Sequence, residues 1–103
     1  MEPVSRFVKM NAKPCRGADL AEILLKAARD LAADPGCLLY LVNRQKDDPD
    51  TVWVTELWRS QADLDATLAQ VRESSEVGAA MEIVASSQLV DLELLGGKGP
   101  EPR

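Results

Sequence analysis

The sequence predicts an α+β domain with the element order β-α-β-β-α-β, in which a four-stranded antiparallel sheet carries both helices on one face. Three stretches support this prediction. Residues 51–58 alternate β-branched and aromatic side chains, and they run directly into a helical pattern that starts at Ser60. Residues 18–33 carry an apolar stripe at helical spacing. Residues 37–43 are apolar on both alternating faces.

The first strand and the first helix are separated by a clear break. Residues 4–12 place Val4, Val8, Met10 and Ala12 on one face and Phe7 on the other, as expected for a strand. A proline and a glycine within residues 13–17 end that pattern. The helix over residues 18–33 then ends at the breaker Asp34-Pro35-Gly36.

The middle of the chain is predicted to form a hairpin. The strand over residues 37–43 should be covered on both faces, because neither alternating set is polar. The polar, proline-containing segment 45–50 is short enough to connect it to the strand over residues 51–58 as an antiparallel pair. The sequence therefore requires something to lie on each side of this sheet.

The second half of the fold starts with a helix cap. Ser60 and Asp63 have the spacing of a capping pair, and apolar residues follow at helical spacing. A second helical stretch is expected over residues 76–84 after an interruption at Ser74, and the last strand over residues 88–95. We expect a single domain over residues 1–95 and a flexible glycine- and proline-rich tail over residues 96–103.

The predicted sheet leaves one apolar face without helices. Large apolar patches are seldom left in water, and an identical copy of the chain is the simplest cover. We therefore expect a homodimer that packs through the sheet faces, with these residues on or near the open face: Phe7, Leu39, Leu41, Trp53, Thr55 and Leu57.

Composition excludes several classes of function. The 103 residues carry a net charge of −5 with scattered Lys and Arg, which argues against a nucleic-acid partner. The chain has no histidine, so a Ser-His or Cys-His catalytic pair and imidazole ligation of zinc or haem iron are excluded. No apolar run is long enough to span a bilayer, and the first ten residues lack the apolar segment of a signal peptide. We expect a cytoplasmic protein with no membrane partner.

Cys15 and Cys37 are the only cysteines, which is too few for a zinc site. The predicted topology places them at opposite ends of the sheet, roughly 23 Å apart along seven-residue strands. A disulfide requires Cα atoms within about 7 Å. We therefore interpret both as reduced structural cysteines.

Several short motifs along nearly the whole chain resemble the antibiotic biosynthesis monooxygenase family, which consists of small dimeric ferredoxin-like domains and includes cofactor-free quinol and polyketide oxygenases. Glu56-Leu57-Trp58-Arg59-Ser60 is the most specific match. The weaker matches are Lys13-Pro14, Asp34-Pro35-Gly36-Cys37 with Tyr40, Asp48-Pro49 and Gly96-Gly97-Lys98. The resemblance implies a dimeric α/β barrel and an activity without cofactor or metal.

The sequence also departs from that family pattern. Many members carry a histidine nine residues after the tryptophan, where this chain has Thr67. The usual glycine after Lys-Pro is Cys15, and the position four before the tryptophan is the apolar Val54. Haem degradation needs a histidine for iron, so the resemblance does not extend to that activity.

Strand parity selects the candidate site residues. Glu56 and Trp58 share a face, which should be the helix-facing one if Trp53 lies on the open face. Trp58 is predicted to stack on a planar phenolic substrate, with core packing as the alternative. Glu56 is predicted to take a phenolic proton, with an ion pair to an arginine such as Arg44 as the alternative.

Four further residues complete the candidate set. Asn11 is predicted to assist catalysis by orienting a carbonyl, although a strand-end asparagine often bonds its own turn. Tyr40 could donate to a substrate oxygen, or its hydroxyl could lie at the surface. Thr67 offers a hydroxyl near the substrate but cannot replace an imidazole as a proton shuttle. Met81 is a core residue by default and a pocket-lining residue in the second interpretation.

The leading hypothesis is an oxidoreductase of the cofactor-independent monooxygenase type that acts on a planar, electron-rich aromatic substrate. Once deprotonated, such a substrate can reduce oxygen itself, so the protein need only bind, desolvate and orient it. One alternative is a non-catalytic dimeric module that binds a small ligand, or a degenerate family member. A second alternative is an isomerase or cyclase on polyketide-like substrates, which would need no oxygen.

Overall fold

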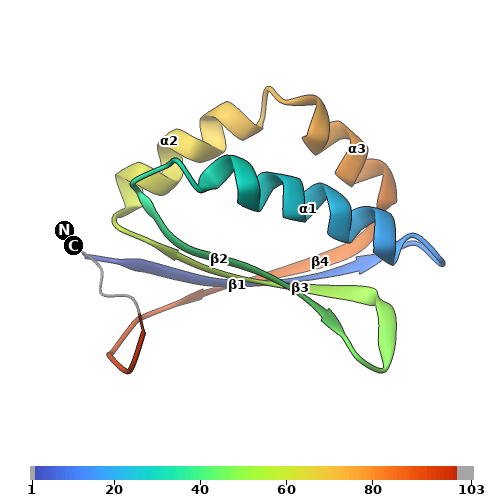
Figure 1. Ribbon diagram of the computed structural model, residues 1–103, viewed down its shortest axis with the longest axis horizontal. Coiled ribbons are helices and arrows are strands. Elements are labelled where there is room, and N and C mark those ends of the chain that lie inside the picture. Colours follow the sequence, from blue (N-terminus) through green and yellow to red (C-terminus); the bar gives the residue numbers. More distant parts are fainter. Residues whose placement is uncertain (1, 100–103) are drawn as a thin grey trace.

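The structure, a computed structural model, describes residues 2–99. Within them four strands and three helices follow in the order β1 (Val4–Ala12), α1 (Gly17–Leu31), β2 (Cys37–Gln45), β3 (Asp48–Trp58), α2 (Gln61–Val71), α3 (Ser75–Ile83) and β4 (Val84–Leu92). The strands form one antiparallel sheet in the order β2-β3-β1-β4. The helices cover one face of it and leave the other open (Figure 1). This confirms the predicted ferredoxin-like α+β fold.

The core lies between the sheet and the helices. Val8, Val52 and Val54 project from the two central strands and are almost completely buried. Leu20 and Leu24 from α1 pack against them, because they recur at helical spacing on the face of α1 that meets the sheet. The even-numbered residues of β1 and β3 therefore face the helices, as the alternating sequence pattern predicts.

Several predicted strand boundaries are wrong. The hairpin turn is limited to Lys46 and Asp47, because β3 begins at Asp48 rather than at Thr51. The last strand begins at Val84 rather than at residue 88, and it ends at Leu92. The prediction of β4 relied on apolar alternation, but β4 is an edge strand whose residues 86–88 are polar and exposed. Hydrogen bonding to β1 defines the strand instead.

The start of α1 is held by the β2–β3 hairpin. The carboxylate of Asp50 accepts hydrogen bonds from the backbone N–H groups of Cys15 (3.1 Å) and Gly17 (2.9 Å). A Cβ on Gly17 would come within 2.0 Å of the Pro49 carbonyl oxygen, so the backbones approach too closely for any side chain. This contact explains why the break between β1 and α1 needs a glycine.

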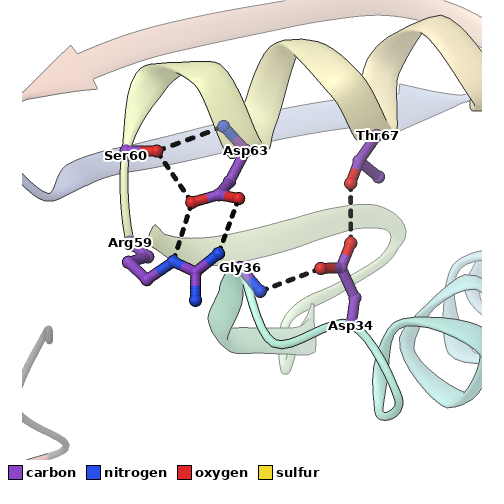
Figure 2. Close-up of polar contacts among 6 residues, drawn as sticks. All are labelled: Asp34, Gly36, Arg59, Ser60, Asp63 and Thr67. Carbon is purple, nitrogen blue, oxygen red and sulfur yellow. Dashed lines mark hydrogen bonds and ion pairs between the residues drawn. The ribbon is translucent and has the colours of Figure 1, made fainter.

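The predicted cap of α2 is present and extended (Figure 2). The Ser60 hydroxyl oxygen accepts from the backbone N–H of Asp63 (3.2 Å) and donates to its carboxylate (2.7 Å). The Arg59 guanidinium forms two 2.9 Å hydrogen bonds to the same carboxylate, and these bonds hold the pKa of Asp63 below its usual value. The turn from β3 into α2 is thus fixed by a local polar network.

The chain after β4 has no regular secondary structure over residues 93–99. Residues 96–99 of the predicted tail belong to this stretch, and residues 100–103 lie outside the described part. Over residues 2–99, no helix combines the length and the apolar character that crossing a bilayer requires.

Candidate functional site

A polar row crosses the helix-facing surface of the sheet. In the register of the strands, Tyr40 of β2 lies opposite Glu56 of β3, Glu56 opposite Arg6 of β1, and Arg6 opposite Asp91 of β4. Tyr40 packs against the helix-side core, which fixes the face on which the row lies. We call these four residues the polar row. Side chains that lie opposite one another across the four strands form a lateral set. In the described sheet, the polar row is the only helix-facing lateral set in which every strand contributes a polar or phenolic side chain.

Apolar side chains flank the polar row on both sides. Val42, Val54, Val8 and Leu89 form the neighbouring lateral set toward the hairpin end of the sheet. Trp58 lies opposite Val4 and Cys37 in the set on the other side. The two charged members on the central strands, Arg6 and Glu56, are buried. Their charges interact more strongly than they would in water, because the local dielectric constant is low.

Glu56 and Trp58 form the centre of the site. The indole Nε1–H of Trp58 donates to Glu56 Oε1 over 2.9 Å, and both side chains are buried. The predicted shared parity of the two residues is thus present, since they are two positions apart on one strand. The hydrogen bond fixes the orientation of the Glu56 carboxylate. The Trp58 ring is only 2% exposed, which encloses it in the surrounding side chains.

Tyr40 lies beside Glu56 as an un-ionised phenol. Burial raises the pKa of its hydroxyl above the usual value, and the charge of Glu56 raises it further. The charge of Arg6 acts in the opposite direction but is the smaller influence. At neutral pH Tyr40 is therefore a hydrogen-bond donor and not a phenolate.

Arg6 is the site residue that the sequence pattern did not select. Its side chain is only 9% exposed, and Nε is a buried nitrogen that has no hydrogen-bond partner within residues 2–99. The available signal was parity, because Arg6 lies between Val4 and Val8 on the apolar face of its strand. A charged residue in the middle of a core-facing pattern is expensive to bury without a function or a partner.

A groove of about 480 Å³ opens between α2 and the β1–β4 edge of the sheet. Arg6 and Asp91 of the polar row reach it, while its apolar walls come from both layers. Trp58 and Glu56 are not among its lining residues, although their cross-strand neighbours Val4 and Arg6 are. The groove therefore lies one strand away from Trp58. A smaller groove of about 260 Å³ lies between the end of α1 and β2 and includes Tyr40 and Cys37.

Thr67 has a partner that the sequence did not suggest. Its hydroxyl donates to Asp34 Oδ2 over 2.7 Å, and Asp34 Oδ1 accepts from the backbone N–H of Gly36 over 2.9 Å (Figure 2). Thr67 is 8% exposed and Asp34 is half-buried, so this bond is partly shielded from solvent. It connects α2 to the loop before β2. The Thr67 hydroxyl therefore makes a contact between two elements of the fold.

The other two predicted site residues lie elsewhere. Asn11 is on the open-face parity of β1, where its amide donates to Ser86 and its oxygen accepts from the hydroxyl of Thr51, both over 3.0 Å. Met81 is 73% exposed on α3. The structure therefore brings together Tyr40, Glu56 and Trp58, and it separates Asn11, Thr67 and Met81 from them.

Both cysteines carry free thiols. Burial, followed by the nearby charges of Asp34 and Glu56, raises the pKa of the Cys37 thiol to about 11. A thiol with this pKa remains protonated at neutral pH and is a poor nucleophile. Within residues 2–99 no cluster of three or more carboxylate, thiol or imidazole side chains is arranged to hold a metal ion.

Known structures share this architecture. A Chloroflexus aurantiacus J-10-fl protein assigned to the antibiotic biosynthesis monooxygenases is 28% identical and superposes with a TM-score of 0.83 over 96% of this chain and 99% of its own. A similarly assigned Deinococcus radiodurans protein is 22% identical, with a TM-score of 0.80 over 95% of this chain and 98% of its own. A mutant of SnoaB, a cofactor-independent oxygenase from Streptomyces nogalater, is 14% identical, with a TM-score of 0.80 over 94% and 97% of the two chains. The last two likenesses concern the fold.

Sequence comparison defines the family. No curated protein matches the chain significantly. The family model described as antibiotic biosynthesis monooxygenase matches residues 3–82, which include the first three strands and all three described helices apart from the last residue of α3. The chain therefore belongs to the antibiotic biosynthesis monooxygenase family.

Proposed function

We propose that the chain is a cofactor-independent monooxygenase that oxidises a planar, electron-rich aromatic substrate of the quinol or polyketide type. Family membership supports the reaction class. The observation that carries the proposal is the buried carboxylate of Glu56, held by Trp58 and placed between a phenol donor and a guanidinium. A base, a donor and a cation in one enclosed row are the groups that removal of an acidic proton from a phenol or anthrone needs.

In the proposed reaction Glu56 removes a proton from the substrate and leaves an electron-rich anion. This anion reduces molecular oxygen directly, and the resulting peroxide forms at the ring carbon. Loss of water then leaves a carbonyl, so that an anthrone and one O₂ give one anthraquinone and one water. Tyr40 stabilises the developing negative charge by donation, and Trp58 acts as a positioning residue through its bond to Glu56.

This proposal narrows the set of residues. Trp58 changes from a stacking surface to a positioning residue, because its ring is enclosed. Asn11, Thr67 and Met81 are left out, since the first lies on the open face, the second bonds Asp34 and the third is solvent-exposed.

Oxygen uptake tests the proposal. The purified chain is mixed with a panel of naphthoquinols and anthrones in an oxygen electrode, and spontaneous oxidation in buffer is subtracted. We expect saturable uptake with at least one member of the panel. Rates equal to buffer for every compound would remove the proposed activity.

A non-catalytic ligand-binding module is the second candidate. It is favoured by Val54, which is 1% exposed and apolar on the same face as Glu56, and by the absence of Trp58 from the groove lining. Titration with naphthoquinones separates the two candidates. Saturable binding without any product by chromatography would favour the binding module.

We also propose that two chains pair through the open sheet face. Phe7, Leu41 and Val90 share that face by strand register and are each exposed by at least two fifths of their surface. Trp53 is on the same face, with the Phe7 ring edge-on at 6.4 Å between centroids and the Lys9 ammonium 5.4 Å from its ring. An apolar face of this kind is normally covered, and a second copy offers the matching surface.

A further inference from the structure

We propose that Arg6 binds an anionic oxygen of the ligand that occupies the groove between α2 and the β1–β4 edge. The ligand class is a flat apolar ring system that carries a carboxylate or a phenolate. This inference uses the groove as a binding site, concerns ligand selection and holds whether or not oxygen is consumed.

Arg6 carries a charge that the described protein does not neutralise by contact. A guanidinium remains protonated at any pH that a folded protein survives. The Arg6 side chain is only 9% exposed, and its Nε–H has no acceptor within residues 2–99. Buried charges in proteins are normally paired, because an unpaired one loses its hydration without compensation. An acceptor supplied by a ligand would provide the missing partner.

The neighbouring carboxylates do not provide it. Glu56 and Asp91 flank Arg6 in the strand register, yet no ion pair within 4.0 Å includes Arg6 in the described part of the chain. Glu56 Oε1 accepts from the indole of Trp58, and Asp91 is exposed on the edge strand, where water solvates its charge. The planar fork of the Arg6 guanidinium therefore remains free for a bidentate acceptor.

The groove has the size and the walls for a ring system attached to such an acceptor. Its volume of about 480 Å³ lies within the roughly 300–1,000 Å³ of small-molecule sites. Leu64 and Leu68 of α2 face Leu89 of β4 across it, and Arg6 is the cation among its lining residues. Asp91 also lines the groove, but it lies on the exposed edge strand, whereas Arg6 is buried. Apolar walls with a buried cation favour an amphipathic anion.

Matched ligands test the inference on the unaltered chain. Isothermal titration calorimetry would compare 2-naphthoate, 2-naphthol and the uncharged 2-naphthamide, which share one ring system. At neutral pH we expect 2-naphthoate to bind at least about tenfold more tightly than the amide, as for a hydrogen bond to a charged group. A phenolate-selective site would instead show tighter 2-naphthol binding only as the pH rises through the ionisation of that ligand. Equal affinities for the acid, the phenol and the amide at every pH would overturn the inference.

Variants assign the effect to Arg6. Arg6→Gln should abolish the preference for the anion over the amide, while Arg29→Gln, which removes an exposed arginine from α1, should leave it intact. If Arg6→Gln does not fold, the Nε–Hε resonance of Arg6 in the ¹⁵N spectrum of the wild-type chain decides. It should shift with 2-naphthoate and not with 2-naphthamide, and an unchanged resonance would contradict the proposal. Failure of oxygen uptake leaves these binding results unaffected, so the two proposals fail separately.

Discussion

The hydrogen bond between Glu56 and Trp58 allows the effect of the Glu56 charge to be tested without a change in side-chain shape. Its Oε1 accepts the Trp58 indole N–H, and the amide oxygen of a glutamine could accept the same bond. Glu56→Gln should therefore fold normally but lose the base. We expect kcat for oxygen uptake to fall about a hundredfold or more, the usual contribution of a general base, with a smaller change in KM.

The matched control is Glu22→Gln, an exposed glutamate on α1. It changes the net charge by the same amount but lies outside the polar row. Unchanged kinetics for Glu56→Gln, or an equal loss in the control, would show that Glu56 is not the base.

A variant of Thr67 tests how much its hydrogen bond contributes to stability without a change in side-chain shape. Thr67→Val keeps the shape of the side chain but removes the donor to Asp34 Oδ2. We expect the free energy of unfolding, measured by urea denaturation, to fall by about 1–3 kcal/mol, because a hydrogen bond to a charged, half-buried acceptor is lost. Thr67→Ser, which retains the hydroxyl, should be the more stable of the two variants.

The outcome for Thr67 also bears on catalysis. Since its hydroxyl is bonded to Asp34, Thr67→Val should leave KM for an aromatic substrate within about twofold at a temperature where the variant is folded. A large rise in KM with no loss of stability would return Thr67 to the substrate site.

Parity explains both the success and the failure of sequence reasoning at single residues. The helix-facing placement of Glu56, Trp58 and Tyr40 followed from alternation along two strands. Arg6 interrupts the apolar pattern of β1, and the same parity places it opposite Glu56. The bonds of Thr67 and Asn11 depend on residues more than thirty positions away, and no local pattern encodes such partners.

At the scale of elements, we expect alanine substitutions of two helical glycines to change stability in opposite directions. Gly17 starts α1 against the backbone of the β2–β3 hairpin, whereas a Cβ on Gly78 in α3 would meet nothing within 4 Å. Gly17→Ala should destabilise the chain by roughly 1–3 kcal/mol or more, because a backbone must move. Gly78→Ala should stabilise it by about 0.5–1 kcal/mol through helix propensity.

Thermal unfolding of the two alanine variants measures this difference directly. A neutral effect of Gly17→Ala would show that the hairpin does not pack against the start of α1 as closely as described. The element boundaries that sequence reasoning missed belong to the same class of effect. The hairpin turn and the start of β4 are set by pairing with neighbouring strands, which propensity does not contain.

At the scale of the whole molecule, we propose that the open sheet face controls assembly. Leu41 on β2 is 51% exposed on that face, and Leu25 on α1 is 39% exposed on the helix layer. Leu41→Glu places a charge, and across a two-fold axis a pair of like charges, in the proposed interface. We expect the dissociation constant of the dimer to rise roughly a hundredfold or more.

Leu25→Glu is the control and should leave the association unchanged. Sedimentation velocity over a range of micromolar concentrations measures both variants. A wild-type chain that remains monomeric throughout that range would contradict the proposed dimer.

The most direct test of the proposed chemistry follows the oxygen atoms. The chain is incubated with an anthrone under ¹⁸O₂, and the quinone is analysed by mass spectrometry after subtraction of the uncatalysed product. We expect one ¹⁸O atom in each enzymatic quinone and a large loss of this product in Glu56→Gln. A quinone formed without ¹⁸O, or one formed at the rate of buffer alone, would contradict the account.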